Sequence, residues 1–197
     1  DEAVSHAFIW VVMIGAVLAM HRNEHLRLTM FVDGMSPRVR GIVHAFALAA
    51  VAAFLIGLIG PAIEHVKEEW IVTSPALDIP GGVRVAAIAV GLVLMLAVVA
   101  VYSLRTVSKT NLAIAIVGVA SFVGLCTVLA PQLAQLGLLN ILIFLTGLVA
   151  LCLVAGVPIA FCFGCGVMAF LAFTSKVPLI VIVGRIESGR LAVGDSL

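Results

Sequence analysis

The sequence predicts an all-α integral membrane protein that crosses the bilayer several times. Of its 197 residues, 63% are hydrophobic and only 11% are charged, and the mean hydropathy is +1.29. A soluble domain carries about 25% charged residues, so a soluble fold could not bury this much apolar surface. The apolar residues also fall into long runs. We therefore expect about six transmembrane helices together with interfacial amphipathic helices.

The predicted spans follow from the length of these runs. A helix rises 1.5 Å per residue, so about 20 apolar residues cross the hydrocarbon core. The runs that meet or approach this length are roughly 3–20, 38–60, 83–104, 111–130, 137–155 and 158–174. A shorter amphipathic stretch, roughly 177–190, follows the last of them.

Prolines mark the predicted boundaries of several spans. Ser36 and Pro37 suit an N-cap and a first helical residue. Pro61 and Pro131 are expected to end the second and fourth spans, because proline lacks the N–H that a continuing helix needs. Pro158 is expected to open the sixth span in the same way.

The loop charges predict the orientation. Loops 21–40 and 105–110 hold most of the basic residues between the spans: Arg22, Arg27, Arg38, Arg40, Arg105 and Lys109. Loop 61–82 is mainly acidic, and loop 131–136 is uncharged. Basic loops stay in the cytoplasm, so the first two loops are expected inside and the other two outside. Arg84 is an exception to this rule.

The outer segment 62–74 has an amphipathic pattern. One helical face carries Ile63, Val66, Trp70, Ile71 and Ser74, and the other carries Glu64, His65, Glu68 and Glu69. This pattern predicts a helix lying in the membrane surface with Trp70 as its anchor. Glu64, Glu68, Glu69 and Trp70 are candidate contacts for a soluble partner, because an acidic field steers a basic one.

The cysteines suggest one enzymatic alternative. Cys162 and Cys165 form a C-x-x-C motif, as in thiol–disulfide enzymes. A membrane redox enzyme would need a second cysteine pair as a relay, and Cys126 and Cys152 occur singly in other spans. We therefore predict that the motif is chemically idle and that the protein is not an enzyme.

Metal, cofactor and nucleic-acid sites are not expected. His21 and His25 have a metal-binding spacing, but no third ligand is evident beyond Glu24. No basic patch with interleaved aromatics is present, which argues against nucleic acid as a partner.

Residues 85–174 contain almost no ionisable side chains within the spans, whereas ion pathways need such groups. The spans therefore resemble scaffold. Small residues at every fourth position predict a helix-packing face at Ala45, Ala49, Ala53 and Gly57.

Three stretches resemble the membrane subunits of tripartite ATP-independent periplasmic (TRAP) transporters. Residues 25–33 and 36–40 are similar to the first inner loop of the small permease subunit, and residues 70–80 to its outer loop. Val85 and Ala89 depart from that pattern, where an aromatic residue and a proline are expected. Residues 156–161 and 177–189 resemble the start of the large permease subunit.

The resemblance implies a domain plan and a function. It assigns 1–110 to a small subunit without its first helix, 111–136 to a connecting helix and outer loop, and 137–197 to the start of the large subunit. It implies a multi-pass protein of the bacterial inner membrane, whose partners are the bilayer, the remainder of the large subunit and a periplasmic binding protein.

The mechanism implied by the family is import of an organic acid driven by a sodium gradient. The resemblance places the substrate and sodium sites in hairpins of the large subunit beyond this sequence, so no catalytic or ligand residue is carried over and no bound cofactor is expected. A membrane redox enzyme, another polytopic carrier or an assembly protein remain the alternatives.

Overall fold

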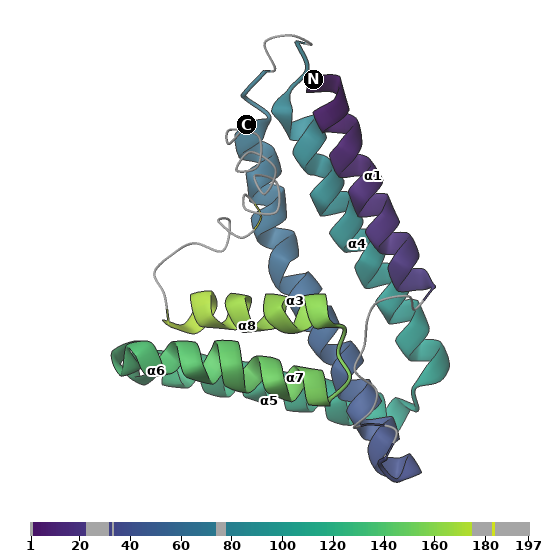
Figure 1. Ribbon diagram of the computed structural model, residues 1–197, viewed down its shortest axis with the longest axis vertical. Helices are drawn as coiled ribbons and strands as arrows, with labels where there is room; N and C mark the ends of the chain where they lie inside the picture. Colours follow the sequence, from purple (N-terminus) through teal and green to yellow (C-terminus); the bar gives the residue numbers. More distant parts are fainter. Residues whose placement is uncertain (1, 23–31, 33, 74–77, 175–182, 184–197) are drawn as a thin grey trace, which may run out of the picture. The chain divides into compact units, whose positions relative to one another are not determined.

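The computed structural model describes residues 2–22, 32, 34–73, 78–174 and 183, and these are almost entirely helical (Figure 1). In chain order the elements are α1 (Glu2–His21), α3 (Pro37–Glu69), α4 (Gly81–Thr106), α5 (Lys109–Leu133), the 3₁₀-helix η1 (Ala134–Leu136), α6 (Leu138–Ile141), the π-helix η2 (Leu142–Leu148), α7 (Val149–Val154) and α8 (Ile159–Thr174). Extended pairing in the described part is limited to an isolated bridge between Thr73 and Pro80. The all-α prediction is confirmed. The stretch 177–190 lies outside the described residues, except for Val183.

Within the described residues, four helical segments are long and apolar enough to cross a membrane. They are Ala3–His21, Pro37–Glu69, Gly81–Thr106 and Lys109–Leu136. The fifth and sixth predicted spans are also helical, but they form shorter apolar helices, Leu139–Val154 and Ile159–Thr174. At 1.5 Å per residue each reaches about 24 Å, against about 30 Å of hydrocarbon.

The two prolines predicted to end helices do not do so. Pro61 lies inside α3 and Pro131 inside α5. A proline removes one backbone hydrogen bond, but in an apolar setting the remaining N–H and C=O groups are still best satisfied by continuing the helix. α5 ends two residues after Pro131, at Leu133, where the chain tightens into η1. The predicted separate surface helix is therefore wrong, because residues 62–69 continue α3.

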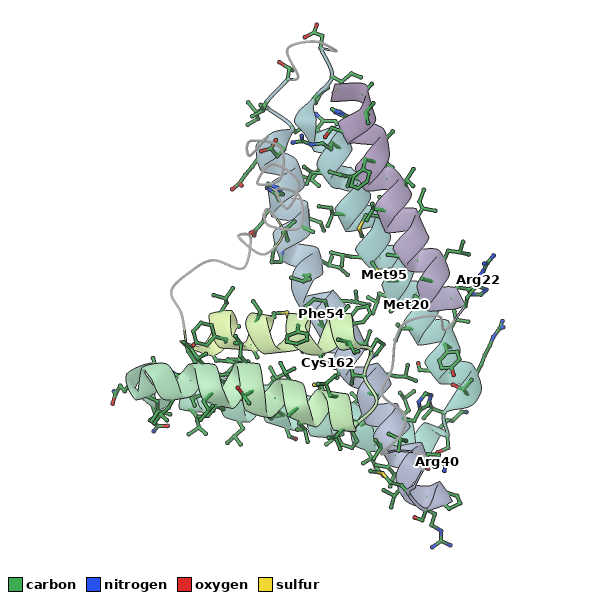
Figure 2. All side chains as sticks on the ribbon, viewed as in Figure 1. Met20, Arg22, Arg40, Phe54, Met95 and Cys162 are labelled. Atoms are coloured by element: carbon green, nitrogen blue, oxygen red, sulfur yellow. The ribbon has the colours of Figure 1, made fainter. Side chains whose placement is uncertain are left out.

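The chain divides into two compact units, and the first contains residues 1–23, 55–98 and 178–197. Its described part pairs α1 with the first two-thirds of α4 (Figure 1). The indole Nε1 of Trp10 donates a hydrogen bond to the carbonyl of Val83 at 3.2 Å. Met13 fills the space beside Gly91, where a Cβ would collide with it. Met20 and Met95 are buried and lie toward each other (Figure 2).

The second unit contains residues 24–54 and 99–177. Ala45 and Ala49 of α3 form a buried cluster with Ala115 of α5. Next to it, the ring of Phe46 lies where a Cβ on Gly118 would stand. The first half of the predicted small-residue face is thus confirmed as a packing face, because these side chains let α3 and α5 approach closely.

The same unit holds the antiparallel pair formed by α8 and the α6–η2–α7 segment (Figure 1). Phe144 and Ala169 pack with Cys126 of α5. Gly166 of α8 is so close to the opposite helix that a Cβ there would meet Val149 and the carbonyl of Phe144. α5 therefore contacts α3 through one part of its surface and α8 through another.

Candidate functional site

The predicted partner-contact residues lie where α3 ends and the chain returns into α4. The backbone closes this turn tightly. The N–H of Val72 donates to the carbonyl of Glu69 at 3.3 Å, and the N–H of Gly81 donates to the carbonyl of Val72 at 2.7 Å. Asp78 adopts a positive φ of 52°, a conformation that Asp tolerates better than most residues. The backbone geometry of both ends of the turn is thereby fixed.

Glu69 differs from the other two acids of this surface. Its Oε2 lies 3.9 Å from Nη2 of Arg84, and both side chains are less than a third exposed. A Cβ on Gly81 would stand 2.9 Å from the same carboxylate oxygen. The carboxylate therefore lies beside the first residues of α4, where its negative charge interacts favourably with the positive end of the helix dipole. Glu69 has a structural partner, and Arg84, the exception to the charge rule, has a nearby acid.

Glu64 and Glu68 are exposed on α3. The helical pattern predicted this orientation, and the structure places both acids one turn apart on the same side of the helix. Lys67 is exposed beside them. A contact between these acids and a partner stays a prediction.

Trp70 packs with part of its ring against Gly82, where an added Cβ would stand 2.5 Å from Cε3. It remains 54% exposed, and the two residues after it are more open still: Ile71 is 87% exposed and Val72 57%. The helical pattern of the sequence places Trp70 and Ile71 on the side predicted to face the membrane. The sequence signal for this exposed apolar group is the run of three large apolar residues directly after Glu68 and Glu69.

The cysteines gather in the second unit in a way that the sequence did not predict. Cys152 on α7 lies beside Cys165 on α8, and the Cys165 thiol donates to the carbonyl of Ala50 on α3 at 3.8 Å. Cys162 instead donates to the carbonyl of Val157 at 3.3 Å. All four cysteines are free and buried. Cys152 is isolated in the sequence. The packing of α7 on α8 brings it close to Cys165.

The interior of the second unit offers little polar chemistry. A cavity of about 400 Å³ between α3, α5 and α7 is lined only by apolar side chains and glycine, among them Phe46, Phe122 and Cys152. The described buried polar residues are Ser103 and Asn140. Asn140 donates from Nδ2 to the carbonyl of Leu133, and its Oδ1 has no hydrogen-bond partner within the described part of the chain.

His21 and His25 are the pair whose spacing suits metal ligation. His25 and Glu24 lie outside the described residues. Among the residues that the structure places, no group of three or more His, Cys, Asp or Glu side chains could hold a metal ion.

Comparison with known proteins supplies the family. Residues 1–110, more than half of the chain, match the family described as tripartite ATP-independent periplasmic transporters, DctQ component. Comparison with curated proteins found no match, and comparison with solved structures found none. The matched segment covers α1, α3, α4 and the first residues of α5. The chain thus belongs to the DctQ family, the small membrane component of TRAP transporters.

Proposed function

We propose that this chain is the scaffold part of a TRAP permease that imports an organic acid into bacteria, driven by a sodium gradient. The acid is delivered by a periplasmic binding protein, and residues 137–197 begin the large permease subunit, joined through 111–136. Membership in the DctQ family supports a role as a membrane component of such a transporter.

The scaffold role is supported by the polarity of the helices. From Val85 to Thr174 the charged residues are Arg105 and Lys109, at the junction of α4 and α5. Intramembrane transport sites for ions and anions need charged or strongly polar groups. The apolar lining of the cavity in the second unit agrees with this absence.

The joined arrangement is supported by α5, the predicted connector. Ala115 and Gly118 contact Ala45 and Phe46 in the family-matched segment. Cys126 packs with Phe144 and Ala169 of the following segment. A linker that merely tethered two subunits would not need buried contacts on both. α5 instead has the contacts expected of a helix that fixes one subunit against the other.

The test is uptake by the full-length transporter in liposomes, with the solute-binding protein encoded beside it and a panel of radiolabelled organic acids. We expect uptake that requires an inward sodium gradient and the binding protein. Residues 1–197 alone are expected to transport nothing. Uptake without sodium would contradict the coupling, and uptake by residues 1–197 alone would contradict the scaffold role.

A further inference from the structure

We infer that Trp70, Ile71, Val72 and Ile79 form an apolar tip that inserts into an apolar socket with a basic rim on a soluble protein outside the membrane. The inference rests on the proposed function, because it takes that protein to be the periplasmic binding protein. These side chains are 54%, 87%, 57% and 37% exposed, respectively. They lie together at the turn between α3 and α4, which we call the α3–α4 tip.

The tip is held by a fixed backbone. The carbonyl of Val72 accepts from Gly81, Thr73 bridges to Pro80, and Trp70 rests on Gly82. The Glu69–Arg84 pair closes the base of the turn. Exposed apolar side chains on an ordered backbone lose little entropy when they bind, so preorganisation favours docking.

The length of α3 argues against lipid as the occupant. The uninterrupted apolar run of α3 ends at Ile63, and Trp70 comes seven residues later, which is about 10 Å along a helix. The headgroup layer adds only about 5–7 Å to each side of the hydrocarbon. An average tilt of about 20° changes this height little. α3 therefore lifts the tip to the outer limit of the headgroups or beyond them.

The surrounding charge specifies the partner. Glu68 and Asp78 are exposed next to the tip, with Lys67 as the basic residue beside them, and Glu64 is exposed one turn of α3 before Glu68. Glu69 and Arg84 offset each other. The rim is therefore net acidic, which would repel anionic headgroups and attract a basic surface. Charge of this kind raises the association rate, while buried apolar contacts hold the complex together.

The experiment uses the full-length transporter in nanodiscs and the purified solute-binding protein encoded beside it, with binding followed by interferometry. The tip variant is I71S/V72S. The conservative variant I71L/V72I keeps the apolar surface. The matched control is L136S, at an exposed leucine on the other loop predicted outside. A charge variant, E64Q/E68Q, tests the rim.

We expect I71S/V72S to weaken binding at least about tenfold, mainly through faster dissociation. I71L/V72I and L136S should bind like the wild type. E64Q/E68Q should slow association and reduce its dependence on salt. If I71S/V72S binds normally, the tip inference is wrong while the proposed function stands. If the wild type binds no solute-binding protein, both are wrong.

A second measurement decides between protein and lipid. Within residues 1–197, W10F leaves Trp70 as the remaining tryptophan, and in the full-length transporter the fluorescence lost on adding W70F isolates its signal. Lipids brominated along their acyl chains quench only an indole inserted among them. We expect no quenching. Strong quenching of Trp70 would mean that the tip is a lipid anchor and would overturn the inference.

Discussion

Glu69 and Arg84 face each other across the turn between α3 and α4, with Oε2 and Nη2 3.9 Å apart. The pair accounts for two separate observations from the sequence. Arg84 breaks the pattern of basic residues inside, and Glu69 stands in an acidic group predicted to face a partner. Their proximity gives each a local role, because the arginine is offset by a nearby acid and the glutamate stabilises the start of α4.

Replacing Glu69 with Gln tests this role. Both side chains are partly exposed, so solvent screens the pair and the expected loss of stability is at most about 1 kcal/mol. Thermal unfolding of the purified protein in detergent would measure it. Glu68→Gln is the matched control, because Glu68 is exposed one residue away. A larger loss for Glu68→Gln than for Glu69→Gln would contradict the assignment.

Packing between α3 and α5 is predicted to depend on Gly118. A Cβ there would stand 2.6 Å from two ring atoms of Phe46. Gly118→Val should therefore cost about 1–3 kcal/mol through overpacking, seen as a lower unfolding temperature and reduced yield. Gly124→Val in the same helix is the control, because nothing lies within 4 Å of its added Cβ. Equal effects of the two substitutions would show that helix propensity, not the contact with Phe46, decides the outcome.

The C-x-x-C motif is predicted to be idle. Cys162→Ala with Cys165→Ala removes two buried thiols and the contact of Cys165 with Cys152. We expect full-length protein carrying both changes to keep its uptake rate within about twofold, since a buried cysteine behaves as a small apolar residue. The measurement is uptake normalised to the inserted protein. Lost uptake at normal expression would mean that the thiols have a chemical role.

The orientation is predicted from the basic loops. Single cysteines at Asn23 and Ser108, in a full-length background free of other cysteines, should react with an impermeant thiol reagent only after the cells are opened. A cysteine at Gln135, in the uncharged loop, should react in intact cells. Labelling of Asn23 or Ser108 in intact cells would overturn the topology.

Most of the fold could be predicted from the sequence, because the apolar runs dominate it. The span predicted over 83–104 becomes α4 at Gly81–Thr106, and that predicted over 158–174 becomes α8 at Ile159–Thr174. The errors came from Pro61 and Pro131. A proline removes one backbone hydrogen bond, but the many others keep an apolar helix intact.

The candidate site was predictable only in part. Exposure of Glu64 and Glu68 follows from helical periodicity, which is local. The pairing of Glu69 with Arg84 joins residues on two different helices, and the contact of Cys152 with Cys165 depends on how α7 packs on α8. Contacts of this kind are set by tertiary packing. A periodic pattern within one helix carries no information about them.

The π-helical turn at Leu142–Leu148 makes the length of the chain adjustable at one place. A π turn accommodates one residue more than an α turn. Deleting Gly147 would let the segment close into a regular α-helix, while Asn140 and Cys152 keep the sides that they now present. Gly147 is not tightly packed: a Cβ added there would have the carbonyl of Leu142 as its neighbour, 3.8 Å away. The same deletion within α8 would rotate every later residue by about 100°. Homologous chains that differ in length by a single residue are therefore expected to differ here first.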